Sequence, residues 1–191
     1  MIKAIIFDCF GVLTTDVWLD FCDNLPAGAD LARASELNRA HDRGLITEQE
    51  YIDGVESATG QVPPSLEALH RGEIVKNRAL LNLINRLKTD YKIGLMSNIS
   101  SDWITSEFLT ETEQNLFDSM VLSYQVGMIK PDPLIYTLAC ERLRVTPDEA
   151  IMVDDRPQYV EGARAVGLYG VWYEDMHSFT AQLNELLATD Y

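Results

Sequence analysis

Near its start the chain carries the segment KAIIFDCFGVL, residues 3–13. Its first part, residues 3–7, is a short and mostly apolar run with branched side chains, which is typical of a strand buried in a parallel sheet. The run ends at Asp8. Ligands of open parallel sheets bind beyond the carboxyl ends of the strands. The segment therefore predicts a strand that delivers a carboxylate to a binding site.

Further apolar runs of the same kind occupy residues 92–96, 120–122 and 150–153, and a last strand is predicted over 168–173. Stretches with helical periodicity lie between and after them, for example Leu80, Ile84 and Leu87. Strands that alternate with helices indicate a parallel sheet covered on both faces. The predicted fold class is α/β, a Rossmann-like doubly wound parallel sheet.

About eighty positions separate the first two predicted strands, whereas a crossover between parallel strands needs little more than a dozen residues. Residues 16–77 carry helical signals of their own, including a helix start at Thr47 before Tyr51, Ile52 and Val55. We therefore expect a small helical cap at 16–77, inserted into a core made of residues 1–15 and 78–191.

Composition narrows the function. The 191 residues suit one compact domain with a small insertion, and 15 Lys+Arg against 30 Asp+Glu give a net charge of −15. Such a charge repels phosphate backbones and anionic lipids, which argues against a nucleic-acid or membrane partner.

The three cysteines show no metal-ligand spacing and the N-terminal apolar run is too short for a signal peptide, so we expect a soluble cytoplasmic protein. Nothing in the sequence indicates an oligomeric state.

Polar residues follow each predicted strand. Asp8 follows the first, Ser97 and Asn98 the second, Lys130 the third, and the pair Asp154–Asp155 the fourth. Each alone could cap a helix or start a turn. Four such clusters at the same edge of a sheet predict a site that combines carboxylates, a hydroxyl and an ammonium group.

The order and spacing of these residues resemble the haloacid dehalogenase superfamily, in the subgroup with a helical cap inserted after the first motif. Motif one is carried by residues 5–13, motif two by 95–98, motif three by 127–133, and motif four by 151–155 with 161–163. The resemblance spans nearly the whole chain, and it implies a hydrolase.

The resemblance also implies roles. Asp8 would be the nucleophile, Ser97 and the Asn98 backbone would hold the transferring group, and Lys130 would pair with Asp8 and with the substrate anion. Mg²⁺ would lie among the metal ligands, which are Asp8, the carbonyl of Phe10, Asp154 and, through water, Asp155. Physical reasoning supports this set, because a carboxylate that attacks a phosphate dianion needs cations to neutralise the approach.

Phe10 is the main departure from the family pattern. Phosphatases of the superfamily usually place a second Asp two residues after the nucleophile, where it protonates the leaving oxygen, and a phenyl ring cannot do so. Three explanations stay open. The protein is a phosphatase that is slow, uses good leaving groups or borrows an acid such as Asp16; or it is a 2-haloacid dehalogenase-like hydrolase, whose halide leaves without a proton; or it is a degenerate binding or regulatory protein.

Motif four favours the first explanation. A dehalogenase of the resembling branch would carry neutral Ser and Asn there, whereas Asp154 and Asp155 would repel a haloacid carboxylate. We therefore expect a Mg²⁺-dependent phosphatase that acts on a small phosphorylated metabolite through an aspartyl-phosphate intermediate.

Other residues give weaker signals. Arg156 is a candidate anion contact. Trp18 and Phe21 could wall the pocket, although aromatic residues at helical spacing more often belong to a core. The histidines at 41, 70 and 177 are isolated in the sequence and are expected at the surface or at helix ends.

Overall fold

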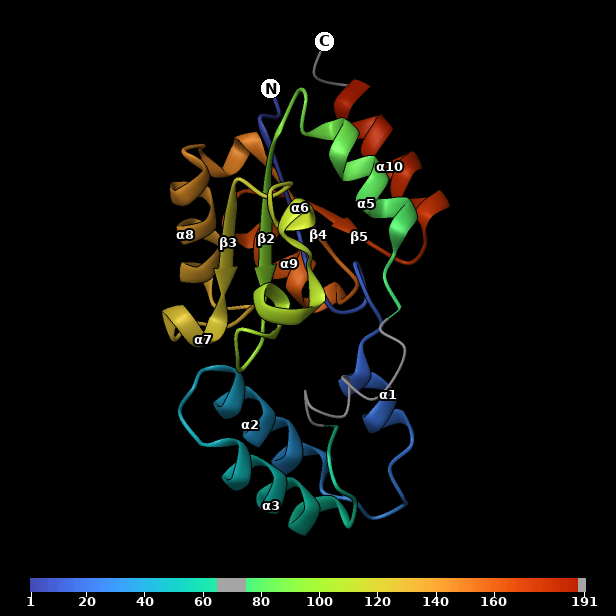
Figure 1. The fold of residues 1–191 in the computed structure, drawn as a ribbon, viewed down its shortest axis with the longest axis vertical. Helices are drawn as coiled ribbons and strands as arrows, with labels where there is room; N and C mark the ends of the chain where they lie inside the picture. Colours follow the sequence, from blue (N-terminus) through green and yellow to red (C-terminus); the bar gives the residue numbers. More distant parts are fainter. Residues whose placement is uncertain (65–74, 189–191) are drawn as a thin grey trace.

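The computed structural model describes residues 1–64 and 75–188. Its centre is a parallel sheet with the strand order β3-β2-β1-β4-β5 (Figure 1). The strands are β1 Ala4–Phe7, β2 Lys92–Ser97, β3 Ser119–Leu122, β4 Ala150–Asp154 and β5 Tyr169–Trp172. Helices cover both faces of the sheet, which confirms the predicted α/β class.

The register brings the strand ends together. Phe7 of the central strand β1 lies opposite Leu95 of β2 and Val153 of β4. The residues that follow these three positions therefore emerge at one edge of the sheet. Asp8, Ser97 and Asp154 are all buried there.

Two helical layers cover the sheet. On one face α5 Arg78–Leu87 and α10 Met176–Ala188 pack on side chains that include Ile5 and Phe7. On the other face α8 Pro133–Leu143 and α9 Pro157–Ala165 pack on side chains that include Ile6. The side chains of successive strand residues thus pack against opposite helical layers, as the pleat of a strand requires.

Short elements connect these layers. They are the π-helix η1 Ile104–Phe108, α6 Glu111–Gln114, α7 Ser123–Val126 and the 3-10 helix η2 Pro147–Glu149. Within the described part of the chain, no helix combines the length and the apolarity that a membrane crossing needs.

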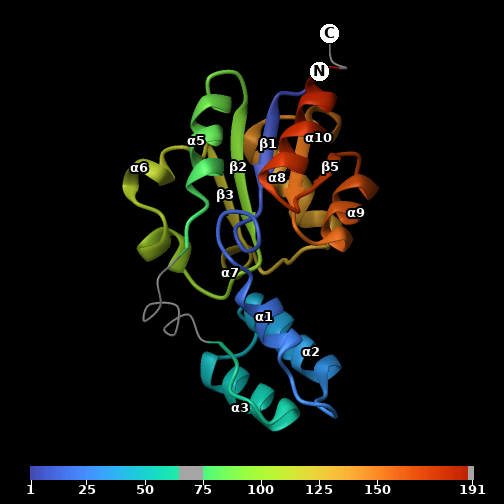
Figure 2. The same ribbon diagram turned by 90° about the vertical axis from the view of Figure 1, so that its right-hand side faces the viewer.

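In the described part of the chain between β1 and α5 there are three helices, namely α1 Val17–Asp23, α2 Leu31–Asp42 and α3 Glu48–Thr59. We call the chain from 16 to 77 the helical insertion, and its described part is 16–64 and 75–77. Both ribbon views show its helices beyond the end of the sheet that is opposite to the N-terminus (Figures 1 and 2). That is the end toward which the arrowheads of β2 and β3 point.

The insertion has a small core of its own. Ala34 of α2 is buried against Tyr51 and Val55 of α3, and Trp18 and Phe21 of α1 pack on this cluster. Thr47 begins α3 with a capping box, as the sequence predicts: it accepts from the Glu50 backbone N–H while the Glu50 side chain accepts from the Thr47 N–H. This packing holds α2 and α3 together over the sheet edge.

Candidate active site

A fully buried ammonium group joins two strand ends. Lys130 Nζ lies 2.7 Å from Asp8 Oδ2 and 2.6 Å from Asp154 Oδ2. A buried lysine is stable only when its charge is paired, and here two carboxylates share it. The ion pair expected between Lys130 and Asp8 is present.

Three carboxylates converge at this point. Oxygen atoms of Asp8, Asp154 and Asp155 all lie within 4.8 Å of one another. Asp155 Oδ1 is buried and has no hydrogen-bond partner among the described residues. One ammonium group cannot balance three carboxylates, so the donor set fits a hard cation with oxygen ligands such as Mg²⁺.

The pKa values reflect this crowding. Burial raises the pKa of Asp8 to about 7, Lys130 lowers it, and Asp154 raises it further. Burial likewise raises the pKa of Asp155 to about 7, with added repulsion from Asp8 and Asp16. The pKa of Lys130 is raised: burial acts against its charge, but attraction to Asp154 and Asp8 outweighs that effect. The site therefore favours bound cations.

Gly11 shapes the loop over this cluster. Its φ of +78° lies in the left-handed region, and a Cβ built on it would lie 2.1 Å from Asp155 Oδ2. Only glycine allows the loop to pass this close to the carboxylate. The sequence showed Gly11 as part of a motif, but not this reason for it.

Ser97 and Asn98, the last two residues of motif two, differ in their hydrogen bonding. Ser97, at the end of β2, is fully buried, and its Oγ has no hydrogen-bond partner among the described residues, so it is free to meet a ligand. The Asn98 side chain accepts from the Lys130 backbone N–H at 2.8 Å and donates to the Lys130 carbonyl at 3.2 Å. Its side chain thus fixes the backbone that carries Lys130.

Phe10, two residues after Asp8, lies in an aromatic stack. Its ring stacks on Trp103 at 5.8 Å between centroids, and Trp103 stacks on Phe108 at 5.1 Å. Phe10 also lines the same pocket as Asp8. The position that would normally carry an acid is therefore filled by a packed ring.

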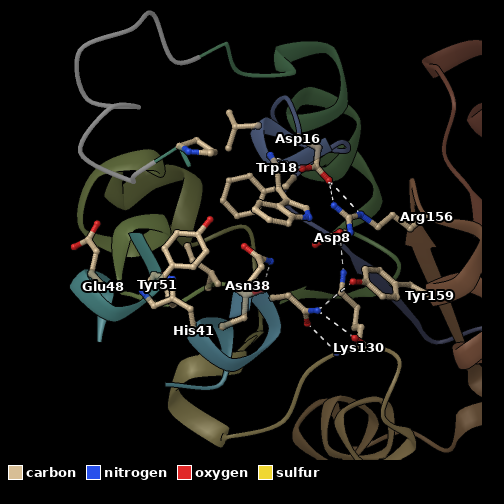
Figure 3. A pocket seen from close by; sticks show the side chains of 17 residues that line it. Asp8, Asp16, Trp18, Asn38, His41, Glu48, Tyr51, Lys130, Arg156 and Tyr159 are labelled. Atoms are coloured by element: carbon tan, nitrogen blue, oxygen red, sulfur yellow. Dashed lines mark hydrogen bonds and ion pairs between the residues drawn. The ribbon is translucent and has the colours of Figure 1, made fainter. Parts of the chain in front are cut away.

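A pocket opens between the sheet edge and the helical insertion, with about 760 Å³ of space including its open mouth. Figure 3 shows Asp8, Lys130 and Tyr159 on one side of it, with Trp18, Asn38, His41 and Tyr51 from the insertion on the other. Sequence patterns do not predict that Asn38 and Tyr51 line this pocket, because only the tertiary fold brings α2 and α3 to the strand ends.

Arg156 and Asp16 join the two walls of the pocket. Arg156 Nη2 lies 2.5 Å and Nε 3.2 Å from Asp16 Oδ2, while Asp16 Oδ1 accepts from the backbone N–H groups of Trp18 and Leu19. The Asp16 carboxylate is thus occupied on both oxygens. Arg156, the candidate anion contact, is paired with Asp16 and also lies over the ring of Tyr159.

The isolated histidines differ in position. His41 lies in the last turn of α2, as expected of a helix-end histidine, but it is half-buried, lines the pocket and stacks on Tyr51 at 4.4 Å. Burial lowers its pKa. His177 is exposed near the start of α10, and the residue at 70 lies outside the described residues. The sequence did not predict that His41 lines the pocket.

Comparison with known proteins agrees with the geometry. The family model described as haloacid dehalogenase-like hydrolase matches residues 2–167. The sesquiterpene phosphatase astK of Aspergillus oryzae is 28% identical, with 97% of this chain and 96% of that protein covered. Bifunctional epoxide hydrolase 2 of Rattus norvegicus is 32% identical over 46% of this chain, but the match spans only 16% of that protein's length.

Solved structures share the fold. A magnesium complex of a HAD family enzyme from Bacteroides thetaiotaomicron superposes with a TM-score of 0.68 at 23% identity, covering 93% of this chain and 98% of that one. A 2-haloacid dehalogenase from Pseudomonas syringae superposes with a TM-score of 0.65 at 19% identity, covering both chains completely. A shared fold does not determine the reaction. The choice between phosphate hydrolysis and dehalogenation therefore has to be argued from the residues of the site.

Proposed function

The chain belongs to the haloacid dehalogenase-like hydrolase family, and on that premise we propose that it is a Mg²⁺-dependent phosphatase acting on a small phosphorylated metabolite. The observation that carries this proposal is the buried cluster of Asp8, Asp154 and Asp155 around Lys130. A haloacid brings its own carboxylate and would be repelled by such a cluster, whereas a metal-bound phosphate is attracted to it. The cluster therefore favours phosphoryl chemistry over dehalogenation.

In this proposal the Asp8 carboxylate attacks phosphorus and forms an aspartyl phosphate, which water then hydrolyses. Lys130 holds Asp8 in place and neutralises the incoming anion. Ser97 Oγ and the Asn98 backbone N–H would donate to the phosphoryl oxygens. Asp8, Asp154, Asp155 and the Phe10 carbonyl would hold Mg²⁺, which when bound supplies positive charge for the transferring group.

The helical insertion would act as the cap that selects the substrate. Trp18 and Tyr51 line the pocket from that side, and Phe10 and Tyr159 line it from the core. Such walls favour an apolar or ring-containing alcohol portion. The relative astK is itself named a sesquiterpene phosphatase, which agrees with an apolar substrate. The net charge of −15 argues against a nucleic-acid or membrane partner and so supports a small-molecule substrate.

A metal-dependent hydrolase screen tests the proposal. Purified protein is assayed with alkyl, sugar, acyl and aryl phosphates and with 2-chloropropionate, each with Mg²⁺ or with a chelator. We expect phosphate release that needs Mg²⁺ and is lost in Asp8→Asn, which keeps the side-chain shape but removes the nucleophilic charge. Halide release without Mg²⁺ would instead establish the dehalogenase alternative, and no turnover together with no Mg²⁺ binding would indicate a binding protein.

A further inference from the structure

A residue of the helical insertion with a carboxyl group lines the same pocket as the proposed reaction centre. Asp42 is the last residue of α2 and lines the pocket together with Asp8 and Lys130. It comes from the wall opposite the nucleophile, which is the side on which a leaving alcohol must lie if the phosphoryl group is bound at Asp8. Phe10 leaves that side without the usual proton donor.

The backbone of Asp42 is tied to the core. The fully buried Ser123 lies with its Oγ 2.6 Å from the Asp42 carbonyl, to which it donates, and the same Oγ accepts from the Ile99 N–H at 2.8 Å. Ile99 directly follows the motif-two residue Asn98. One hydroxyl therefore fixes the end of α2 against the loop that would bind the phosphoryl group.

The surroundings of Asp42 favour its protonated form. A carboxylate at a helix C-terminus faces the negative end of the helix dipole. Asn38 Nδ2 donates to Oδ2 at 3.1 Å, and the other oxygen, Oδ1, has no hydrogen bond among the described residues. Burial raises the pKa of Asp42 to about 7; Arg156 and Lys130 lower it, and Asp16 and Asp8 raise it. Asp42 in turn helps to raise the pKa of Tyr51.

The other carboxyl groups that line the pocket, among the described residues, are less suited to donate a proton. Both carboxylate oxygens of Asp16 already accept hydrogen bonds, one from Arg156 and the other from two backbone N–H groups, so they are engaged away from a leaving alcohol. Glu48 is exposed to solvent in the first turn of α3, whereas a catalytic acid has to be held in position. Asp8 is the proposed nucleophile. Asp42 is the remaining carboxyl group.

We propose that Asp42 is the catalytic acid that replaces the missing donor at Phe10; this inference rests on the phosphatase function proposed above. Asp8 forms a bond to phosphorus, the bond between phosphorus and the alcohol oxygen breaks, and that oxygen takes its electron pair and the proton of Asp42. The oxygen of a water molecule then attacks phosphorus and water gives a proton to the Asp42 carboxylate, while the bond between phosphorus and the Asp8 oxygen breaks and leaves its electron pair on the Asp8 carboxylate. Phosphate leaves, and both side chains return to their starting states.

The test compares two leaving groups of similar shape in the full Mg²⁺-loaded chain. Single-turnover release of alcohol is measured with 2-phenylethyl phosphate, which has a poor leaving group, and with 4-nitrophenyl phosphate, which has a good one. In Asp42→Asn we expect release from the alkyl ester to fall by about 10² or more, and release from the aryl ester to change by less than about tenfold. Asp53→Asn is the matched control, because Asp53 is exposed on α3 and, among the described residues, its side chain bonds only Gln49; neither rate should change.

The outcomes separate the two proposals. If the wild-type chain hydrolyses neither ester, the phosphatase function fails and the role of Asp42 fails with it. If the wild type hydrolyses both and Asp42→Asn leaves the alkyl-to-aryl ratio unchanged, the role of Asp42 alone is overturned. Loss of folded protein cancels from that ratio, and Asp42→Ser supplies the same ratio if Asp42→Asn does not accumulate.

Discussion

Gly11 has no side chain, and this leaves room for the carboxylate of Asp155 in the proposed metal site. A Cβ at this position would overlap the Asp155 carboxylate, and the φ of +78° would strain any larger residue. We expect Gly11→Ala to displace Asp155, to weaken Mg²⁺ binding by roughly 10–100-fold, and to cost about 1–3 kcal/mol of stability. Calorimetric Mg²⁺ titration and urea unfolding measure the two effects.

Gly60 supplies the control for that experiment. Its φ of +74° is close to that of Gly11, yet a Cβ there would meet nothing within 4 Å. Gly60→Ala should therefore lose stability through backbone strain and keep its Mg²⁺ affinity. Equal Mg²⁺ affinity in the two variants would show that the contact with Asp155 is unimportant.

We expect Phe10→Asp to supply the same proton donation that we assign to Asp42. In the Asp42→Asn background, Phe10→Asp is expected to raise the alkyl-to-aryl turnover ratio toward the ~10²–10⁴ of a positioned acid. In the wild-type background the gain should be much smaller, because a donor is already present. A double-mutant cycle on this ratio measures the coupling. The new side chain loses the stacking of Phe10 on Trp103, so folding is checked first; equal gains in both backgrounds would contradict the prediction.

At the scale of elements, Asp16 connects α1 to the core. It caps α1 and pairs with Arg156, which follows β4. Asp16→Asn keeps an oxygen for the cap but removes the charge opposite Arg156. We expect turnover of alkyl and aryl phosphates to fall by the same factor, through a higher KM, because the pocket wall is loosened while the proton donor remains. A selective loss of alkyl turnover, measured by steady-state kinetics, would instead make Asp16 the acid.

The strands could be predicted because their apolar runs are short, branched and ended by polar residues. The topology of a parallel sheet then brings Asp8, Ser97 and Asp154 to one edge. For this reason the residues that the sheet contributes to the site could be predicted from the sequence. The π-helix η1 and the single-turn α6 were not predicted, since such short elements carry no clear period. Asp42, Asn38 and Tyr51 were missed for another reason: their contact with the site depends on how α2 and α3 lie over the sheet, which local patterns do not encode.

At the scale of the whole molecule, the acidic character of the surface continues into the site. The chain carries a net charge of −15, and three of its carboxylates meet in a buried cluster with one lysine. Such a cluster costs folding free energy whenever its carboxylates are charged and no cation is bound. If this cluster holds the proposed metal ion, folding stability, metal binding and pH are coupled.

The coupling to pH has a definite sign. In the folded protein the pKa values of Asp8 and Asp155 are raised from 3.8 to about 7. Between these values the folded state retains protons that the unfolded chain has released, so these groups lower stability as pH rises toward 7, and the loss is complete above it. The lowered pKa of Glu149, about 2, favours the folded state only at higher pH than that value, and its contribution is constant above about pH 5.

Mg²⁺ binds the deprotonated carboxylates, and it should therefore stabilise the protein more at about pH 8 than at about pH 5.5. The measurement is the rise in Tm caused by Mg²⁺ over a chelator, taken at both pH values. His41 has a lowered pKa and contributes a slope of opposite sign near its ordinary pKa, but it is present in both arms and cancels from the difference. Asp155→Asn should show a smaller rise at the higher pH, because one ligand charge is gone. A Mg²⁺-induced rise that is equal at both pH values in the wild type would mean that these carboxylates do not hold the ion.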